Sequence, residues 1–103
     1  RYTPDPTTVD DNKRILPAVF SMRAYPNPFN SNLRIFVESQ EPGSIVIYNI
    51  LGRVIAEFEY ESGSSLIQWD ATGKSGQHVS TGIYIIGKRG GDVTGYKKVL
   101  YLK

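Results

Sequence analysis

The stretch that decides the fold is Tyr25-Pro26-Asn27-Pro28-Phe29-Asn30. Its two prolines fix two backbone φ angles and remove two N–H donors. Each proline also favours extended geometry at the residue before it, here Tyr25 and Asn27. Asparagine side chains bond to the nearby backbone and favour tight turns. The stretch therefore cannot form a helix or a central strand, and we expect a stiff, turn-forming lead-in that Phe29 pins onto a hydrophobic core.

The composition around this stretch indicates one small all-β domain. The chain has 103 residues, of which 40% are hydrophobic and 12% aromatic, with seven tyrosines, ten glycines and six prolines. This is enough apolar material for one core and too short a chain for two domains. Richness in tyrosine, glycine and proline is typical of strands that are separated by many turns.

Charge and cysteine content exclude several classes of function. The formal net charge is only +2, and the twelve Lys and Arg residues are spread along the chain, so the sequence carries no nucleic-acid footprint. Zero cysteines exclude disulfides, catalytic thiols and thiolate metal sites. No apolar run approaches the ~18 residues of a membrane helix, so no membrane insertion is expected.

The chain divides into two parts. Residues 1–14 contain two prolines, three threonines and three aspartates with few apolar side chains. Such a segment buries too little apolar surface to offset its ordering entropy, so we interpret it as a polar linker from a preceding domain. Residues 15–103 are expected to form the folded domain.

Apolar alternation and turn signals predict a series of strands after the linker. The strand over residues 15–22 is expected at a sheet edge, because Pro17 interrupts it. The remaining strands are predicted over residues 33–38, 44–50, 53–60, 65–69, 82–88 and 96–103. No segment shows a helical repeat. The fold class is therefore all-β, an immunoglobulin-like antiparallel β-sandwich of about seven strands.

Three details of this sandwich follow from the side-chain pattern. Residues 44–50 are apolar on both faces, which predicts a covered, central strand. In residues 53–60 the side chains of Val54, Ala56, Phe58 and Tyr60 are expected to share one face. Asn49-Ile50-Leu51-Gly52 has the residue types of a type I turn, which would close a hairpin.

The last predicted strand, residues 96–103, has one edge for which the sequence predicts no partner strand. We expect this edge to be open, so that a partner can add a strand to it. The lysines Lys97, Lys98 and Lys103 also have a simpler explanation, because charged side chains discourage edge-to-edge aggregation.

Several motifs, taken in their order along the chain, make the sequence similar to a known family. They are residues 25–30, then Ile47-Tyr48-Asn49-x-x-Gly52-Arg53, Trp69-Asp70, Gly76, Ser80-x-Gly82-Ile83-Tyr84 and Lys98-Val99-Leu100. With them the chain resembles the C-terminal sorting domain (type A) of type IX secretion cargo, whose fold overlaps with the immunoglobulin-like domain of flagellar hook-capping proteins. Two positions depart from the family pattern: Thr81 stands between the serine and the glycine, and Ala71 stands where the family often has glycine.

The resemblance implies a route and a set of partners. Such cargo crosses the inner membrane with an ordinary signal peptide, and an outer-membrane secretion translocon then recognises its folded C-terminal domain. A sortase-like surface protease commonly removes the domain, at a point expected in or near residues 1–14. The implied localisation is the periplasm in transit and then the cell surface or the extracellular space. The domain itself would be a non-catalytic monomer without cofactors.

The family pattern also points to particular residues. Candidates for recognition by the translocon are Gly52, Gly82, Lys98, Val99, Leu100, Tyr101, Leu102 and Lys103. The structural motif would consist of Tyr25, Pro26, Asn27, Pro28, Phe29 and Asn30 together with Trp69 and Asp70.

Residues that could carry chemistry have simpler interpretations. His78 is the only histidine, so it cannot form a histidine pair, and an exposed loop position is expected. Asp70 could be a calcium ligand or a general acid, or it could cap a turn by accepting backbone N–H bonds. Glu57 and Glu59 are strand neighbours on one face, which indicates a solvated face rather than a glycosidase carboxylate pair. The segment 73–76 (GKSG) lacks the earlier glycine and the helix of a phosphate loop.

Aromatic residues leave a second class of function open. Trp69 could be a core residue or a platform for a sugar ring. The five tyrosines on the predicted strands could form an exposed carbohydrate-binding surface, or could be ordinary half-buried strand residues; they are Tyr48, Tyr60, Tyr84, Tyr96 and Tyr101. The alternative to a sorting module is therefore an immunoglobulin-like structural or carbohydrate-binding accessory module.

Overall fold

Antiparallel strands account for nearly all regular structure in the described part of the chain. The computed structural model describes residues 20–91 and 95–103. Within these residues there are seven strands: β1 (Phe20–Tyr25), β2 (Leu33–Ser39), β3 (Gly43–Asn49), β4 (Val54–Tyr60), β5 (Gly63–Trp69), β6 (Gly82–Lys88) and β7 (Lys97–Tyr101).

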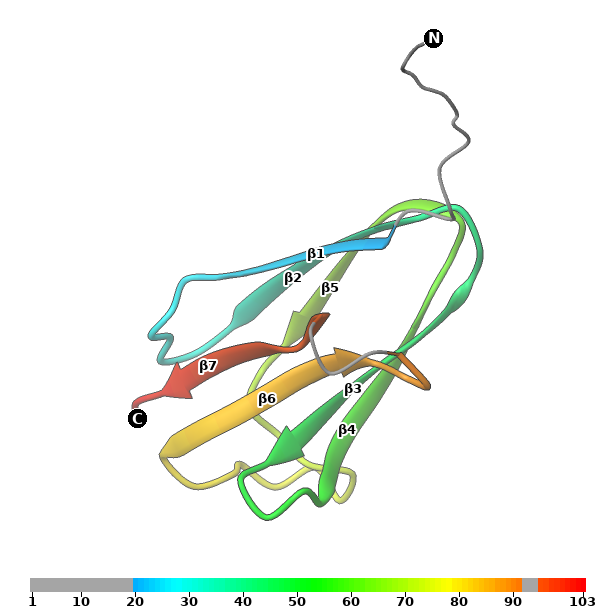
Figure 1. The fold of residues 1–103 in the computed structure, drawn as a ribbon. Helices are drawn as coiled ribbons and strands as arrows, with labels where there is room; N and C mark the ends of the chain where they lie inside the picture. Colours follow the sequence, from blue (N-terminus) through cyan, green and yellow to red (C-terminus); the bar gives the residue numbers. More distant parts are fainter. Residues whose placement is uncertain (1–19, 92–94) are drawn as a thin grey trace, which may run out of the picture.

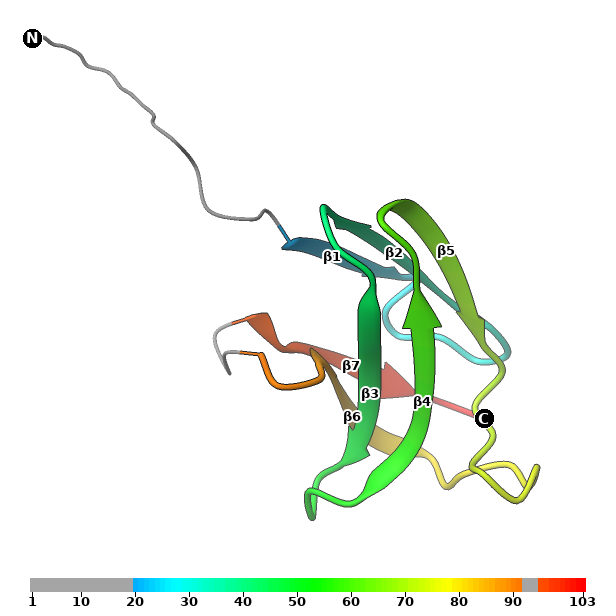
Figure 2. The ribbon, with the colours of Figure 1, turned by 90° about the vertical axis from the view of Figure 1, so that its right-hand side faces the viewer.

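The strands form two stacked sheets, as Figures 1 and 2 show. One sheet has the order β1-β2-β5 and the other has the order β4-β3-β6-β7, with antiparallel pairing throughout. The strand β3 lies between β4 and β6, which confirms the predicted central position. The all-β sandwich predicted from the sequence is confirmed.

The core lies between the sheets and is built from the inward-facing residues of both. On β2 the buried residues alternate at Leu33, Ile35 and Val37, as period-2 patterning requires. On β3 the buried inward residues are Ile45 and Ile47. Burial of this apolar surface is the main force that holds the two sheets together.

Trp69 is the largest side chain of this core. It is 1% exposed, and its indole N–H donates to the backbone carbonyl of Thr72 at 2.8 Å. Its ring contacts that of Tyr84 in a T-shaped arrangement, with ring centroids 5.4 Å apart. Trp69 is therefore a core residue with a satisfied polar atom, and the alternative of a sugar platform is wrong.

A β-bulge in β4 changes one predicted face. Ile47 pairs with Ala56, but its neighbour Tyr48 pairs with Val54, so Ile55 is the extra residue of the bulge. Ala56, Phe58 and Tyr60 share one face as predicted, and this face packs inward. The prediction for Val54 is wrong, because the bulge turns it away from the core and leaves it 42% exposed.

The first strand extends further along the chain than its apolar pattern indicates. The predicted edge strand covered residues 15–22, whereas β1 spans Phe20–Tyr25 and lies at a sheet edge. Residues 15–19 lie outside the described residues, as does the linker predicted over residues 1–14. Arg23 is charged, so the apolar pattern does not show that the strand continues beyond residue 22. The side chain of Arg23 is exposed because β1 exposes every second side chain.

A tyrosine fixes the entry to β6. The hydroxyl of Tyr84 donates to the backbone carbonyl of Ser80, four residues earlier, at 2.6 Å. This arrangement is the tyrosine corner found in immunoglobulin-like sandwiches. Burial, and then the neighbouring Tyr101, raises the pKa of Tyr84 above its ordinary value.

The tyrosine corner predicts how stability changes in alkali. Because the folded state raises the pKa of Tyr84, its contribution is fully present below about pH 10 and is lost as the pH rises through the folded-state pKa. We expect Tyr84→Phe to lower the free energy of unfolding by roughly 0.5–1.5 kcal/mol at neutral pH. The variant should also lose less stability than the parent in alkali.

Urea unfolding at a series of pH values from neutral to strongly alkaline measures both effects. Tyr25→Phe, at an exposed tyrosine, is the matched control and should follow the parent curve. Equal alkaline losses for the parent and Tyr84→Phe would contradict the prediction.

Candidate functional site

The asparagine between the two prolines bonds directly to the last strand. The side-chain carbonyl oxygen of Asn27 accepts the Leu100 N–H at 2.9 Å, and its side-chain amide donates to the Lys98 carbonyl at 3.0 Å. One planar amide group thus pairs with β7 as a strand residue would. Both prolines of the motif follow cis peptide bonds.

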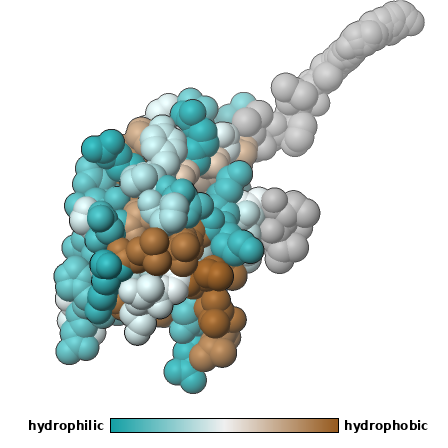
Figure 3. All heavy atoms as spheres, turned by 90° about the vertical axis from the view of Figure 1, so that its left-hand side faces the viewer, coloured by the Kyte–Doolittle hydropathy of each residue, from teal (hydrophilic) through white to brown (hydrophobic). Residues whose placement is uncertain are grey.

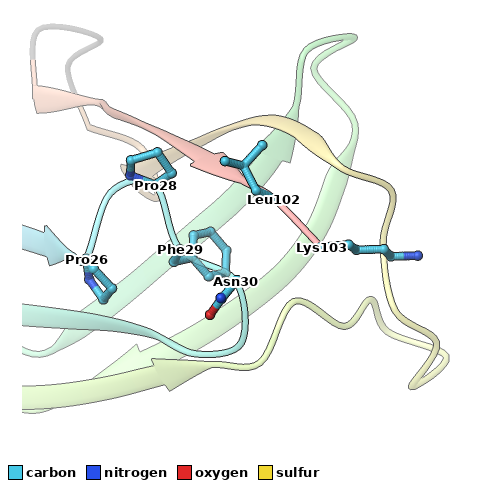
Figure 4. A pocket seen from close by; sticks show the side chains of 6 residues that line it. All are labelled: Pro26, Pro28, Phe29, Asn30, Leu102 and Lys103. Carbon is cyan, nitrogen blue, oxygen red and sulfur yellow. The ribbon is translucent and has the colours of Figure 1, made fainter.

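Phe29 continues this pairing with its backbone and anchors it with its ring. Its N–H donates to the Leu100 carbonyl and its carbonyl accepts the Leu102 N–H, both at 2.9 Å. The buried ring contacts Trp69 and Tyr101, with centroid separations of 5.6 and 5.1 Å. Figure 4 shows the loop with Phe29 running beside the end of β7. The predicted role of Phe29 as a pin into the core is confirmed.

The outer edge of β7 is therefore closed along this stretch. Four outward-facing backbone groups, from the Lys98 carbonyl to the Leu102 N–H, have partners in Asn27 or Phe29. The prediction of an open edge is wrong here, because the chain covers that edge with its own loop. Covering an edge strand is a common way to prevent unwanted strand addition.

The candidate recognition residues of β7 divide into two groups. Val99 and Tyr101 point inward and are buried among the core residues. The others direct their side chains outward: Lys98, Leu102 and Lys103 are exposed and Leu100 is half-buried. Only this second group can contact a partner while the domain stays folded.

The structure brings the remaining candidates to the same end of the four-stranded sheet. Asn49 at the end of β3 pairs with Tyr84 in β6, and Gly82 at the start of β6 pairs with Tyr101 in β7. The turn containing Gly52 follows β3 directly, so it also lies at this end (Figure 1). Residues that are 50 positions apart in the sequence thus share one region of the surface.

Asn49 organises the turn at this end. Its side-chain oxygen accepts the N–H groups of Leu51 and Arg53, at 2.9 and 3.0 Å, and its backbone carbonyl accepts the Gly52 N–H at 2.9 Å. Gly52 has a φ of +83°, where a side chain would be strained. This is the three-residue hairpin loop with a glycine in the left-handed region.

The two departures from the family pattern have structural consequences. The hydroxyl of Thr81 accepts the backbone N–H of Lys103 at 3.3 Å, so it ties the end of the chain to the start of β6. Ala71 has a φ of +63° and is fully buried. A glycine would adopt that angle without strain, which is a physical reason for glycine at this position in the family.

The residues that could carry chemistry show no catalytic arrangement in the described part of the chain. Asp70 accepts the hydroxyl of Thr72 at 2.5 Å, which corrects the predicted bonds to backbone N–H groups. His78 is exposed, and Glu57 is bonded by Arg89 at 2.9 Å through both carboxylate oxygens. Across residues 20–91 and 95–103, no three His, Asp or Glu side chains are grouped to hold a metal.

The described residues likewise include no helix long and apolar enough to cross a membrane.

A pocket of about 410 Å³ lies between the proline-containing loop and the end of the chain. It is lined by Pro26, Pro28, Phe29, Asn30, Leu102 and Lys103 (Figure 4).

The five tyrosines of the predicted strands do not form one exposed surface. Tyr60, Tyr84 and Tyr101 are buried in the core. Tyr48 and Tyr96 stack on the outer face of the four-stranded sheet, with ring centroids 6.1 Å apart. Partial burial and the neighbouring Tyr96 raise the pKa of Tyr48.

Removal of the Asn27 side chain should weaken the closure of the edge. Asn27→Ala loses two hydrogen bonds, so we expect the free energy of unfolding to fall by roughly 1–3 kcal/mol. Asn30→Ala, at an exposed asparagine of the same loop, should change it by less than about 0.5 kcal/mol. Urea unfolding of both variants makes the comparison, and equal losses would contradict the assigned role of Asn27.

The turn glycine should resist substitution because of its backbone angle. A Cβ at Gly52 meets open space, so any destabilisation reports strain rather than a clash. We expect Gly52→Val to lower the free energy of unfolding by about 1–3 kcal/mol. Gly73→Ala, at a loop glycine without positive φ, is the control and should be nearly neutral. A neutral Gly52→Val in thermal and urea unfolding would show that the turn tolerates a side chain.

Comparisons with known proteins agree with this architecture. The family model of the secretion system C-terminal sorting domain matches residues 23–101. The crystal structure of dimeric latent PorU from Porphyromonas gingivalis is similar, with a TM-score of 0.65 and 24% sequence identity. That match covers 86% of this chain and 10% of the PorU chain, and it shows the fold alone. No curated protein matches the sequence. Because the family match runs from β1 to β7, the chain belongs to the secretion system C-terminal sorting domain family.

Proposed function

We propose that residues 15–103 act as a non-catalytic sorting and anchoring module of a larger secreted protein. The module directs that protein across the outer membrane through the type IX secretion system. The observation that carries the proposal is the family match over residues 23–101. The chain spans about a tenth of the PorU chain that it resembles, which is the size relation expected of a module attached to a larger protein.

The proposed route has three steps. The protein folds in the periplasm, and a domain without cysteines needs no oxidant to do so. The outer-membrane translocon then binds the folded module, and a sortase-like surface protease cuts in or near the linker, residues 1–14. The product reaches the cell surface or the extracellular space.

Burial divides the candidate recognition residues by role. In this proposal Lys98, Leu100, Leu102 and Lys103 contact the translocon, because their side chains point outward. Val99 and Tyr101 hold β7 in the core, and Gly52 shapes the β3–β4 turn at the same end of the sheet. The translocon then contacts side chains on a folded strand rather than the backbone of that strand.

A secretion assay tests the proposal. A signal peptide and a periplasmic fluorescent reporter are fused to residues 1–103, and surface and medium fluorescence are measured in a bacterium with a working type IX system. We expect the fusion to be exported, and a combined Lys98→Glu, Leu102→Ser and Lys103→Glu variant to stay in the periplasm. These exposed positions leave the core intact, and urea unfolding checks this.

Lys74→Glu, a single charge reversal at an exposed residue of the loop after β5, is the control and should be exported like the parent. Retention of the intact, folded parent fusion in the periplasm would overturn the proposal. That result would favour the structural or carbohydrate-binding module instead.

A further inference from the structure

Apolar side chains gather on the outer face of the four-stranded sheet, on the side away from the core. Figure 3 views the molecule from the side of Figure 1 on which the C-terminus lies, and shows hydrophobic side chains collected in its lower half. We define the outer apolar face by six residues, which are Tyr48, Ile50, Leu51, Ile83, Ile85 and Tyr96. An exposed apolar area of this kind marks an interaction site more often than single exposed residues do.

The strand register makes this face continuous. Tyr48 pairs with Val54 on one side and with Ile85 on the other, and Ile85 pairs with Lys98. One row of outward side chains therefore crosses all four strands. The bulge in β4 contributes to it, because without the bulge Val54 would face the core.

A groove of about 300 Å³ lies within the face, lined by Tyr48, Asn49, Ile50, Gly52, Ile85 and Tyr96. One wall depends on a glycine in β6. A Cβ at Gly87 would lie 2.3 Å from the ring of Tyr96, so the ring can lie over the strand only because position 87 has no side chain. The stacked pair of Tyr48 and Tyr96 thus forms a fixed aromatic wall.

The hairpin tip beside the groove exposes two large aliphatic side chains. Ile50 is 71% exposed and Leu51 is 75% exposed. The turn itself requires only Asn49 and Gly52, whose hydrogen bonds and backbone angle define it. Polar residues are usual at such positions, so turn formation does not explain isoleucine and leucine here.

Basic residues border the groove. Arg53 follows the groove residue Gly52, and Lys98 pairs with the groove residue Ile85. The carboxylate of Glu57, on the neighbouring β4, is already bonded by Arg89. A second copy docked by two-fold symmetry would bring the same cations onto this area, so charge favours a partner with carboxylates.

We propose that the outer apolar face docks an acidic protein segment of the sorting machinery. This inference rests on the proposed function. An aliphatic or aromatic side chain of the segment fills the groove between Ile50 and the tyrosine pair, and its flanking carboxylates meet Arg53 and Lys98. The docking surface thus extends the recognition residues of β7 across β6 to the β3–β4 turn.

The first test is export of the reporter fusion with the paired substitution Ile50→Ser and Leu51→Ser. Both side chains are exposed, so the urea midpoint should stay unchanged. We expect export to fall at least tenfold. The control is Leu66→Ser on the other sheet, where Leu66 is 52% exposed and should be dispensable. Equal export of the paired variant and the parent would overturn the inference.

The second test identifies the partner by photo-crosslinking in the same secreting cells. A photoreactive phenylalanine analogue replaces Leu51 or, as the control, Leu66. We expect a protein adduct from position 51 alone, with an acidic crosslinked peptide, and loss of that adduct with Lys98→Glu. An adduct with a lipid or with a second copy of this chain would overturn the inference, as would no adduct from an exported fusion. A parent fusion that is not exported would overturn the proposed function, and this inference with it.

Discussion

The pairing of Asn27 and Phe29 with β7 is the constraint on which the rest of the structure depends. It joins segments that are 71 to 73 residues apart and gives the outward backbone groups of the final strand their partners. The same loop places the Phe29 ring between Trp69 and Tyr101. Edge closure and core packing therefore depend on the same loop, which holds the last strand on the side opposite its pairing with β6.

This constraint limits the ways in which a partner protein can bind the domain. A closed edge leaves no backbone groups between Lys98 and Leu102 for strand addition, so recognition falls to outward side chains. The register then places those side chains in one row with Ile85 and Tyr48. The surface that remains for a partner is a face of the sheet, bordered by the turn at Gly52.

Local patterns in the sequence predicted much of the fold, and contacts between distant residues account for most of what it missed. Period-2 alternation located β2, β4 and β5, because each of them has one mainly buried face, whereas turn signals next to the segment located β3, β6 and β7. The bulge at Ile55 was not predicted, because Val54 is apolar although it faces outward, so the apolar alternation continues through the inserted residue. The closed edge was missed because it depends on where the loop with Asn27 lies in space. The tyrosine corner gives no specific sequence signal, because its acceptor is a backbone carbonyl that any residue at position 80 would supply.

Amide hydrogen exchange of Leu100 and Leu102 tests the central claim most directly. Their N–H groups point away from β6 and are bonded only through Asn27 and Phe29 within the described structure. With the edge closed, we expect both amides to exchange as slowly as those of the central strand β3. Exchange as fast as that of the exposed loop residue Lys74 would show that the edge is open in solution and would contradict the account.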